Sequence, residues 1–152
     1  MYLLNLYEKF GFHFDHIYAF EMKKFDPNTV YQKLLPEKYM QSYHWMNTGV
    51  NAEEGHKLNP LHSILKKFDE DDFIVLKLDI DTSSVELPLA KQLLDDKDDF
   101  YHRLLDQFYF EHHVEIGEMK PYWRGFMNGT IKDSFDLFHG LRKKGIAAHF
   151  WV

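Results

Sequence analysis

Cysteine is absent from the 152-residue sequence, which excludes a disulfide framework, a thiolate metal site and a cysteine nucleophile. Glycine is sparse, at 8 residues, and no phosphate loop, Gly-x-Gly-x-x-Gly fingerprint or Gly-x-Ser-x-Gly elbow occurs. The sequence therefore lacks the usual signals of nucleotide binding through such loops and of serine hydrolysis.

An excess of basic residues is also absent. The 18 Lys and Arg face 24 Asp and Glu, and the formal net charge is -6, which argues against non-specific binding to nucleic acid or to an anionic membrane surface. No apolar run approaches the length that crosses a bilayer, so we expect no membrane span. The first residues lack the basic region and the cleavage site of a signal peptide, and we expect a cytoplasmic protein.

Aromatic residues, by contrast, make up 17% of the chain, so large rings must fill much of the core. A chain of 152 residues is typical of one domain, and we expect residues 1–152 to form it. Short apolar runs predict strands at residues 16–20, 43–50, 73–79, 107–112 and 146–151. Helical spacing falls before or between them, at about residues 3–10, 30–35, 60–65, 85–94 and 131–144, whereas residues 95–99 and 115–129 read as loops. This alternation is typical of an α/β fold with a mostly parallel sheet.

The run from Phe73 to Leu78 is the strongest strand signal, because only Lys77 interrupts it. Asp79 and Asp81 follow directly. Ligands of open α/β sheets bind outside the carboxyl ends of the strands, so both carboxylates stand where ligand chemistry would occur. Capping of the helix that follows explains them equally well, and the sequence leaves both readings open.

Polar side chains end four of the predicted strands. They are Glu21, Asn47, Asp79 with Asp81, and Glu111 with His112 and His113. Parallel strands bring their carboxyl ends to one edge of a sheet, so we expect these groups to converge on a small-molecule substrate. An acid after an early strand is the usual partner of ribose hydroxyls, and Glu21 fits that role.

A metal centre is a further reading of the same groups, since His and carboxylate ligands suit Zn, Fe or Mn. The spacing matches no metal motif such as His-Glu-x-x-His. His112 and His113 point to opposite faces of a strand, so at most one of them shares a site with Asp79. We therefore assign no metal ligand, and a metal-dependent hydrolase using Asp79, Asp81 and His113 remains an alternative.

The order of four short motifs resembles the FkbM-type S-adenosylmethionine-dependent methyltransferases. The motifs are Ala19–Glu21, Asn47–Val50, Leu76–Asp81 and Phe110–His113. The resemblance implies a Rossmann-like, methyltransferase-type sheet with helices on both faces and S-adenosylmethionine as cofactor. It assigns cofactor binding to Glu21, Asn47, Gly49 and Val50, and makes Asp79, Asp81 and His113 the candidates for catalysis. Thr82 stands where the family usually has glycine.

The family's first strand and its glycine-rich loop would precede residue 1. The resemblance therefore implies that the chain is the C-terminal portion of the fold, lacking that strand. The strands that would pair with the missing one have exposed, unpaired edges. We therefore expect a longer parent chain or an oligomer partner to cover them. Without the loop, we expect the chain alone to bind S-adenosylmethionine weakly or not at all.

Three functions follow from these observations. The first is methyl transfer to an oxygen or nitrogen of a small molecule or glycan. The second is a non-catalytic module that keeps the methyltransferase fold, and the third is the metal-dependent hydrolase. The sequence leaves open whether the chain is an enzyme and which group would act as general base.

Overall fold

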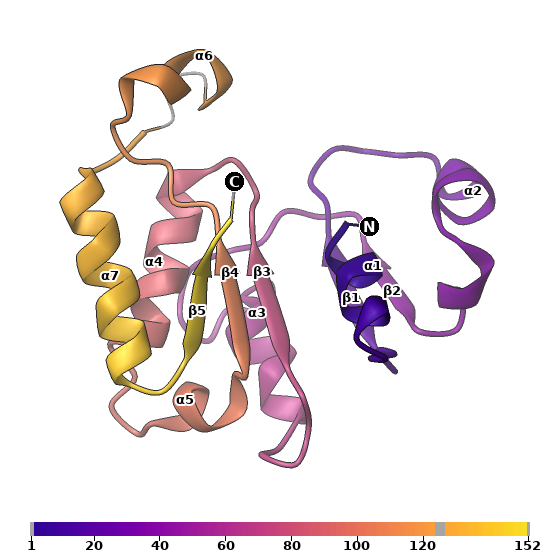
Figure 1. Ribbon diagram of the computed structural model, residues 1–152. Helices are drawn as coiled ribbons and strands as arrows, with labels where there is room; N and C mark the ends of the chain where they lie inside the picture. Colours follow the sequence, from indigo (N-terminus) through magenta and orange to yellow (C-terminus); the bar gives the residue numbers. More distant parts are fainter. Residues whose placement is uncertain (1, 124–126, 152) are drawn as a thin grey trace. The chain divides into compact units, whose positions relative to one another are not determined.

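The computed structural model describes residues 2–123 and 127–151 and shows an α/β protein with parallel sheets (Figure 1). The chain divides into two compact units, Met1–Val50 and Asn51–Val152. Whether the two units together form the predicted single domain stays a prediction. None of the described helices combines the length and the apolar character that a membrane crossing requires.

The first unit contains a two-stranded parallel sheet. Its elements are α1 (Tyr2–Lys9), β1 (Ile17–Phe20), α2 (Pro27–Thr29), the π-helical turn η1 (Val30–Leu34), the 3-10 turn η2 (Glu37–Tyr39) and β2 (Tyr43–Met46). Phe20 at the end of β1 lies opposite Met46 at the end of β2. The two strands therefore deliver the residues that follow them, Glu21 and Asn47, to the same edge.

The second unit contains a three-stranded parallel sheet in the order β3-β4-β5. Its elements are α3 (Pro60–Ser63), η3 (Leu65–Lys67), β3 (Val75–Leu78), α4 (Ser83–Leu94), α5 (Phe100–Leu104), β4 (Gln107–Phe110), η4 (Gly117–Met119), α6 (Lys120–Trp123), α7 (Ile131–Lys143) and β5 (Ala147–Phe150). Leu78, Phe110 and Phe150 lie side by side in the register of the three strands. Asp79 and Glu111 consequently leave the sheet at the same edge.

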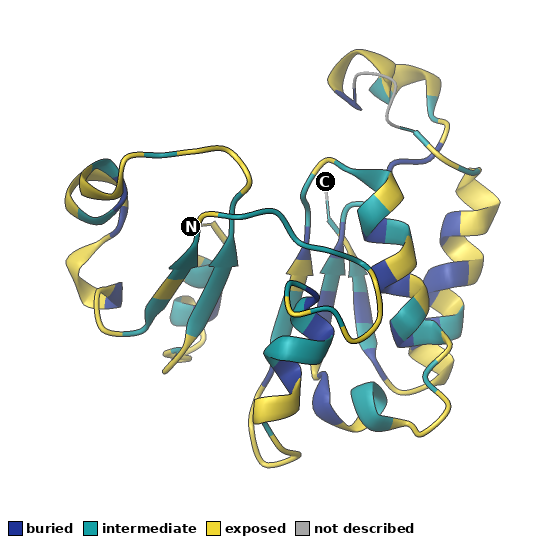
Figure 2. Cartoon of the chain, turned by 180° about the vertical axis from the view of Figure 1, so that it is seen from behind, coloured by how far each residue is buried: buried dark blue, intermediate teal, exposed yellow. Residues whose placement is uncertain are grey.

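The core of the second unit lies between one face of this sheet and helices α4 and α7. Phe108 and Phe110 are buried on that face, and the Phe138 ring of α7 lies 6.2 Å from the Phe110 ring and 4.0 Å from the Phe150 ring. Figure 2 shows buried residues on the strands and along the two helices. Strand residues alternate between faces, so Tyr109 belongs to the opposite face, where its ring stacks on His149.

Helices α4 and α7 approach each other closely near Gly140. A Cβ atom at this position would lie 2.7 Å from Cδ1 of Leu94, at the end of α4. α7 begins with a capping box in which the Thr130 side chain accepts from the backbone N–H of Asp133, and the Asp133 carboxylate accepts from the N–H of Thr130. These two features fix the start of α7 and its packing on α4.

The five predicted strands are confirmed, each somewhat shorter than expected. The prediction of a single loop over residues 115–129 is wrong, because η4 and α6 occupy residues 117–123. Residues 124–126 of that segment lie outside the described part of the chain. Helix α5 was not predicted, because a helix of five residues is too short to show a helical repeat of apolar residues.

Candidate functional site

Three predicted polar groups converge at the carboxyl edge of β3 and β4. Nε2 of His113 lies 3.4 Å from Oε2 of Glu111 and 3.8 Å from Oδ1 of Asp81. The ligand atoms of Asp81, Glu111 and His113 all lie within 4.8 Å of one another. We call these three residues the edge cluster.

His113 is the buried member of the edge cluster. Only 2% of its side chain is exposed, and neither ring nitrogen has a hydrogen-bond partner among the described residues. Its ring stacks on Trp123 of α6 at a centroid distance of 4.7 Å. Trp123 also donates its Nε1–H to Oε1 of Glu111 at 3.1 Å. One indole from the segment predicted as a loop therefore positions two members of the cluster.

Asp81 is the exposed member of the edge cluster, with 81% of its side chain accessible. Its backbone lies in the left-handed region, with φ of 53°. Among residues other than glycine, Asp and Asn tolerate this region best. The turn carries the chain out of β3 and leaves the Asp81 carboxylate open to solvent on one side.

Asp79, predicted to act with Asp81, makes different contacts. Strand alternation places Lys77 on the same side as Asp79, and the two form an ion pair. Burial favours a higher pKa for Asp79, but the hydrogen bond with Lys77, together with Glu111 and Trp151, outweighs it and lowers the pKa. Asp79 therefore stays ionised beside the edge cluster without belonging to it.

Glu86 of α4 is a buried carboxylate that the sequence analysis did not single out. Its two oxygens accept hydrogen bonds from the backbone N–H groups of Ile80 at 2.8 Å and Thr82 at 3.1 Å. Burial raises the pKa of Glu86, and the two hydrogen bonds together with nearby His113 partly offset this effect. The Ser-x-x-Glu pattern from Ser83 to Glu86 resembles a capping box, and this pattern could have pointed to a role of Glu86 at the start of the helix.

The contacts of Glu86 bear on the capping question for Asp79 and Asp81. Thr82 is the N-cap residue of α4 and makes no side-chain capping hydrogen bond. Glu86 instead accepts from the N–H of Thr82 itself and from that of Ile80, two residues before Thr82. The described contacts of the two aspartates lie elsewhere, since Asp79 pairs with Lys77 and Asp81 faces His113.

His112 lies apart from the edge cluster, as predicted for neighbouring residues of one strand. Its ring stacks on Phe110 at 5.1 Å, and its nitrogens also have no hydrogen-bond partner in the described part of the chain. It borders an apolar pocket of about 220 Å³ whose lining also includes Trp123, Phe135 and Trp151. Burial lowers the pKa of His112, Asp133 acts in the opposite direction, and His113 adds to the lowering.

The predicted cofactor residues of the first unit lie together after β1 and β2. The Asn47 amide donates to the carbonyls of Glu21 and Lys23, both at 2.7 Å, and accepts from the N–H of Phe25 at 3.3 Å. Oε1 of Glu21 accepts from the N–H of Lys23 at 2.7 Å. Asn47 therefore holds the turn after β1 in place, which gives it a structural role beside the predicted one.

Gly49 and Val50 follow the same strand. A Cβ atom at Gly49 would make an ordinary contact with Met22, at 3.5 Å, and Gly49 has no left-handed φ. Val50 is half-buried. The local geometry does not require glycine at position 49.

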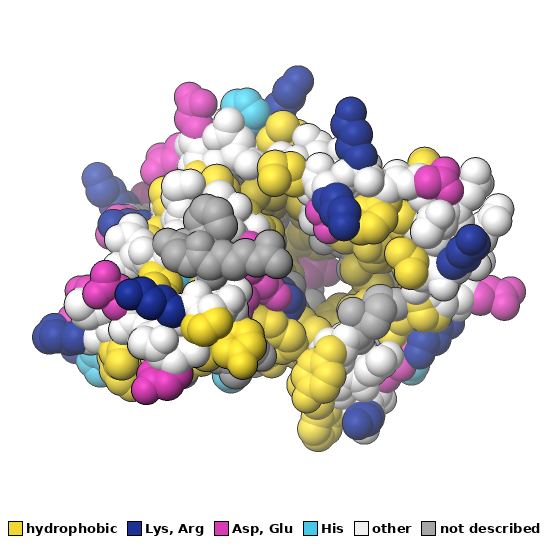
Figure 3. Space-filling model, turned by 90° about the horizontal axis from the view of Figure 1, so that it is seen from above, with side chains coloured by type: hydrophobic (Ala, Val, Ile, Leu, Met, Phe, Trp, Pro, Cys, Tyr) yellow, Lys and Arg dark blue, Asp and Glu magenta, His cyan; other side chains and the backbone are white. Residues whose placement is uncertain are grey.

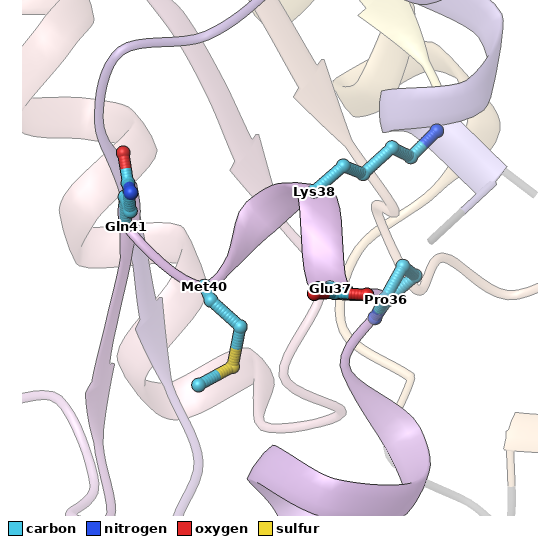
Figure 4. A pocket seen from close by; sticks show the side chains of 5 residues that line it. All are labelled: Pro36, Glu37, Lys38, Met40 and Gln41. Atoms are coloured by element: carbon cyan, nitrogen blue, oxygen red, sulfur yellow. The ribbon is translucent and has the colours of Figure 1, made fainter.

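A hollow in the first unit is lined by none of the predicted site residues. It has a volume of about 870 Å³ and is lined by Pro36, Glu37, Lys38, Met40 and Gln41 (Figure 4). In Figure 4 the side chains of Lys38, Met40 and Gln41 extend away from one another. A wide hollow without converging polar groups is a weaker candidate for chemistry than the smaller edge cluster.

Charge on the face shown in Figure 3 is mixed. On each unit in this view, Asp and Glu side chains stand among Lys, Arg and apolar side chains. This mixture agrees with the presence of both signs of charge in the sequence and with its excess of acidic residues.

Comparisons of the chain with protein-family models, curated proteins and solved structures gave no match. The resemblance to the FkbM-type methyltransferases therefore stays a prediction, and function must be argued from the geometry of the site.

Proposed function

We propose that the chain is an S-adenosylmethionine-dependent methyltransferase-like domain and that the edge cluster lies at the position of its methyl acceptor. The observation that carries this proposal is the meeting of Asp81 with Glu111 and His113, since the two motifs that contain them are far apart in the sequence. Both motifs resemble the family pattern. The acceptor would be a hydroxyl or amine of a small molecule or glycan in the cytoplasm.

Bound S-adenosylmethionine would supply an electrophilic methyl group. The chain's own residues would orient the acceptor and remove its proton, which is the part of methyl transfer that needs positioning and a general base. The exposed Asp81 carboxylate is open to an acceptor hydroxyl, whereas His113 is buried and Asp79 is paired with Lys77. This difference in access favours Asp81 as the group that contacts the acceptor.

Glu21 fits the expected ribose contact. A carboxylate has about four acceptor positions, and the N–H of Lys23 takes one of those on Oε1. The Asn47 amide, by contrast, is engaged on both its nitrogen and its oxygen by the turn after β1. We therefore propose a direct cofactor contact for Glu21 and an indirect one for Asn47.

Saturation-transfer NMR with S-adenosylhomocysteine tests the cofactor assignment, because it detects weak binding. We expect saturation of the ribose protons by the wild-type chain at millimolar ligand, its loss in Glu21→Ala, and its retention in Glu37→Ala, an exposed acid of the same unit. Equal saturation in Glu21→Ala would refute the ribose assignment.

A metal-dependent hydrolase is the second candidate, and one observation favours it. Three side chains that could hold a cation lie close together, although they differ from the predicted three: Glu111 takes the place of Asp79. Hydrolysis would require a metal-activated water at this set, and its test is release of product from generic ester substrates with and without a chelator.

A further inference from the structure

We propose that Asp81, Glu111 and His113 bind one divalent transition-metal cation. The inference rests on the geometry of the edge cluster and holds whether or not the chain transfers methyl groups. The cation would be of the Mn²⁺, Fe²⁺ or Zn²⁺ class, because one imidazole with two carboxylates suits these ions, whereas Mg²⁺ and Ca²⁺ prefer oxygen ligands alone.

The distances from the imidazole to the two carboxylates are those of groups around an ion, and all three ligand atoms lie within 4.8 Å of one another. Metal–ligand distances of about 2.0–2.2 Å place neighbouring ligand atoms about 3–4 Å apart. Nε2 of His113 lies 3.4 Å from Glu111 and 3.8 Å from Asp81. Both distances exceed the N–H···O range of about 2.7–3.2 Å, so they are too long for hydrogen bonds from a protonated imidazole. Rotation of the exposed Asp81 side chain would complete the set.

The burial of His113 supplies an independent reason for a ligand. Its side chain is 98% buried, as the 2% exposed fraction shows, and Nε2 faces two carboxylates without a hydrogen-bond partner among the described residues. Buried polar groups without partners are rare because they lose their hydration without replacement. A bound cation would satisfy Nε2 and both carboxylates at once.

The negative charge at the sheet edge also favours a bound cation. Asp79, Asp81 and Glu111 bring three carboxylates together, and Lys77 pairs with Asp79. The carboxylates of Asp81 and Glu111 then balance the charge of one divalent ion. Paired or metal-bound states are the usual ones for carboxylates gathered at so short a range.

The surroundings are also those of a working metal site. Trp123 stacks on His113 and donates to Oε1 of Glu111, which leaves Oε2 directed at the imidazole. Such outer contacts orient ligands before the ion arrives. Three protein ligands with one exposed side leave a coordination position for water or a substrate oxygen, as in catalytic rather than structural sites.

Titration of the chelator-treated full chain with Mn²⁺, followed by electron paramagnetic resonance, tests the proposal without any cofactor. We expect one saturable site per chain. Asp81→Asn and Asp81→Gly are the informative variants, because Asn and Gly both tolerate the φ of 53° at this exposed position and folding should be preserved. Each should weaken Mn²⁺ binding by at least about 10–100-fold, the range seen when mere outer-shell partners of a metal are removed.

Glu115→Gln is the control for the Asp81 variants, and His112→Gln is the control for His113→Gln. Glu115→Gln removes the same charge from a nearby exposed acid, and His112→Gln alters the neighbouring buried histidine. Both should leave Mn²⁺ affinity within about threefold, well short of the loss on removing a ligand, whereas His113→Gln should abolish binding. Absence of a saturable site in the wild-type chain, or affinity unchanged by both Asp81 variants, would overturn the proposal. Neither result bears on the ribose contact of Glu21, so the two proposals fail separately.

Discussion

Glu86 joins the end of β3 to the start of α4 through two backbone hydrogen bonds, to the N–H groups of Ile80 and Thr82. We expect Glu86→Ala to lower the free energy of unfolding by about 1–3 kcal/mol or more, because it leaves two N–H groups without their partner. Urea unfolding measures the change. Glu115→Ala, at an exposed acid, should change stability by less than about 0.5 kcal/mol, and an equally small effect of Glu86→Ala would contradict the assigned role.

His112 should make stability depend on pH. Burial lowers its pKa, so the folded chain holds the imidazole neutral where the unfolded chain, with a pKa near 6.5, binds a proton. The stability contributed by neutral His112 is therefore present above about pH 6.5 and lost as the pH falls through the lowered pKa. Urea midpoints at about pH 7.5 and about pH 5.5 should converge more closely in His112→Phe than in the wild-type chain. The same pH dependence in both proteins would show that His112 is not the cause.

Residue roles were predictable where strand alternation alone decides them. The separation of His112 from the carboxylates follows from the period of two, as does the placement of Glu111 and His113 on one side. The same rule places Lys77 beside Asp79, where the two can form an ion pair. It does not predict that Asp79 forms this pair rather than joining the edge cluster. The left-handed turn at Asp81 and the stacking of Trp123 depend on tertiary contacts that the sequence does not display.

At the scale of elements, the approach of α7 to α4 at Gly140 yields a prediction. Alanine stabilises a helix by about 1 kcal/mol relative to glycine. In Gly140→Ala, however, the added Cβ atom would displace Cδ1 of Leu94. We therefore expect the change in the free energy of unfolding on Gly140→Ala to be more stabilising in a Leu94→Ala background than in the wild-type chain. The coupling free energy in a double-mutant cycle should be about 0.5–3 kcal/mol.

The exposed neighbour His139 provides the control for this cycle. His139→Ala should show no coupling to Leu94→Ala, because sites without shared contacts are additive. Coupling of the same size at His139, or none at Gly140, would contradict the packing described for the two helices.

Elements with a strong apolar pattern were predicted from the sequence, and short ones without it were not. All five strands carry apolar or aromatic residues in runs bounded by polar turns. Helix α5 has five residues and follows an acidic stretch, so it shows no full helical period. Helix α6 begins in a segment rich in proline and glycine, and Pro121 is compatible with it only as part of a first turn.

At the scale of the molecule, the alternation of strands and helices predicted the α/β class and the parallel pairing, and both are confirmed. Helices on both faces and the methyltransferase-type topology stay predictions. The pairings β1-β2 and β3-β4-β5 follow from neighbouring positions in the sequence.

We propose that Asp81, Glu111 and His113 form a ligand-binding centre at the carboxyl edge of β3 and β4. A crystal structure of the full chain grown with Mn²⁺, with anomalous diffraction recorded at the manganese absorption edge, tests it most directly. We expect one anomalous peak within about 2.0–2.3 Å of Oδ1 of Asp81, Oε2 of Glu111 and Nε2 of His113. An edge without a peak, in which Nε2 of His113 instead donates a hydrogen bond to either carboxylate, would contradict it.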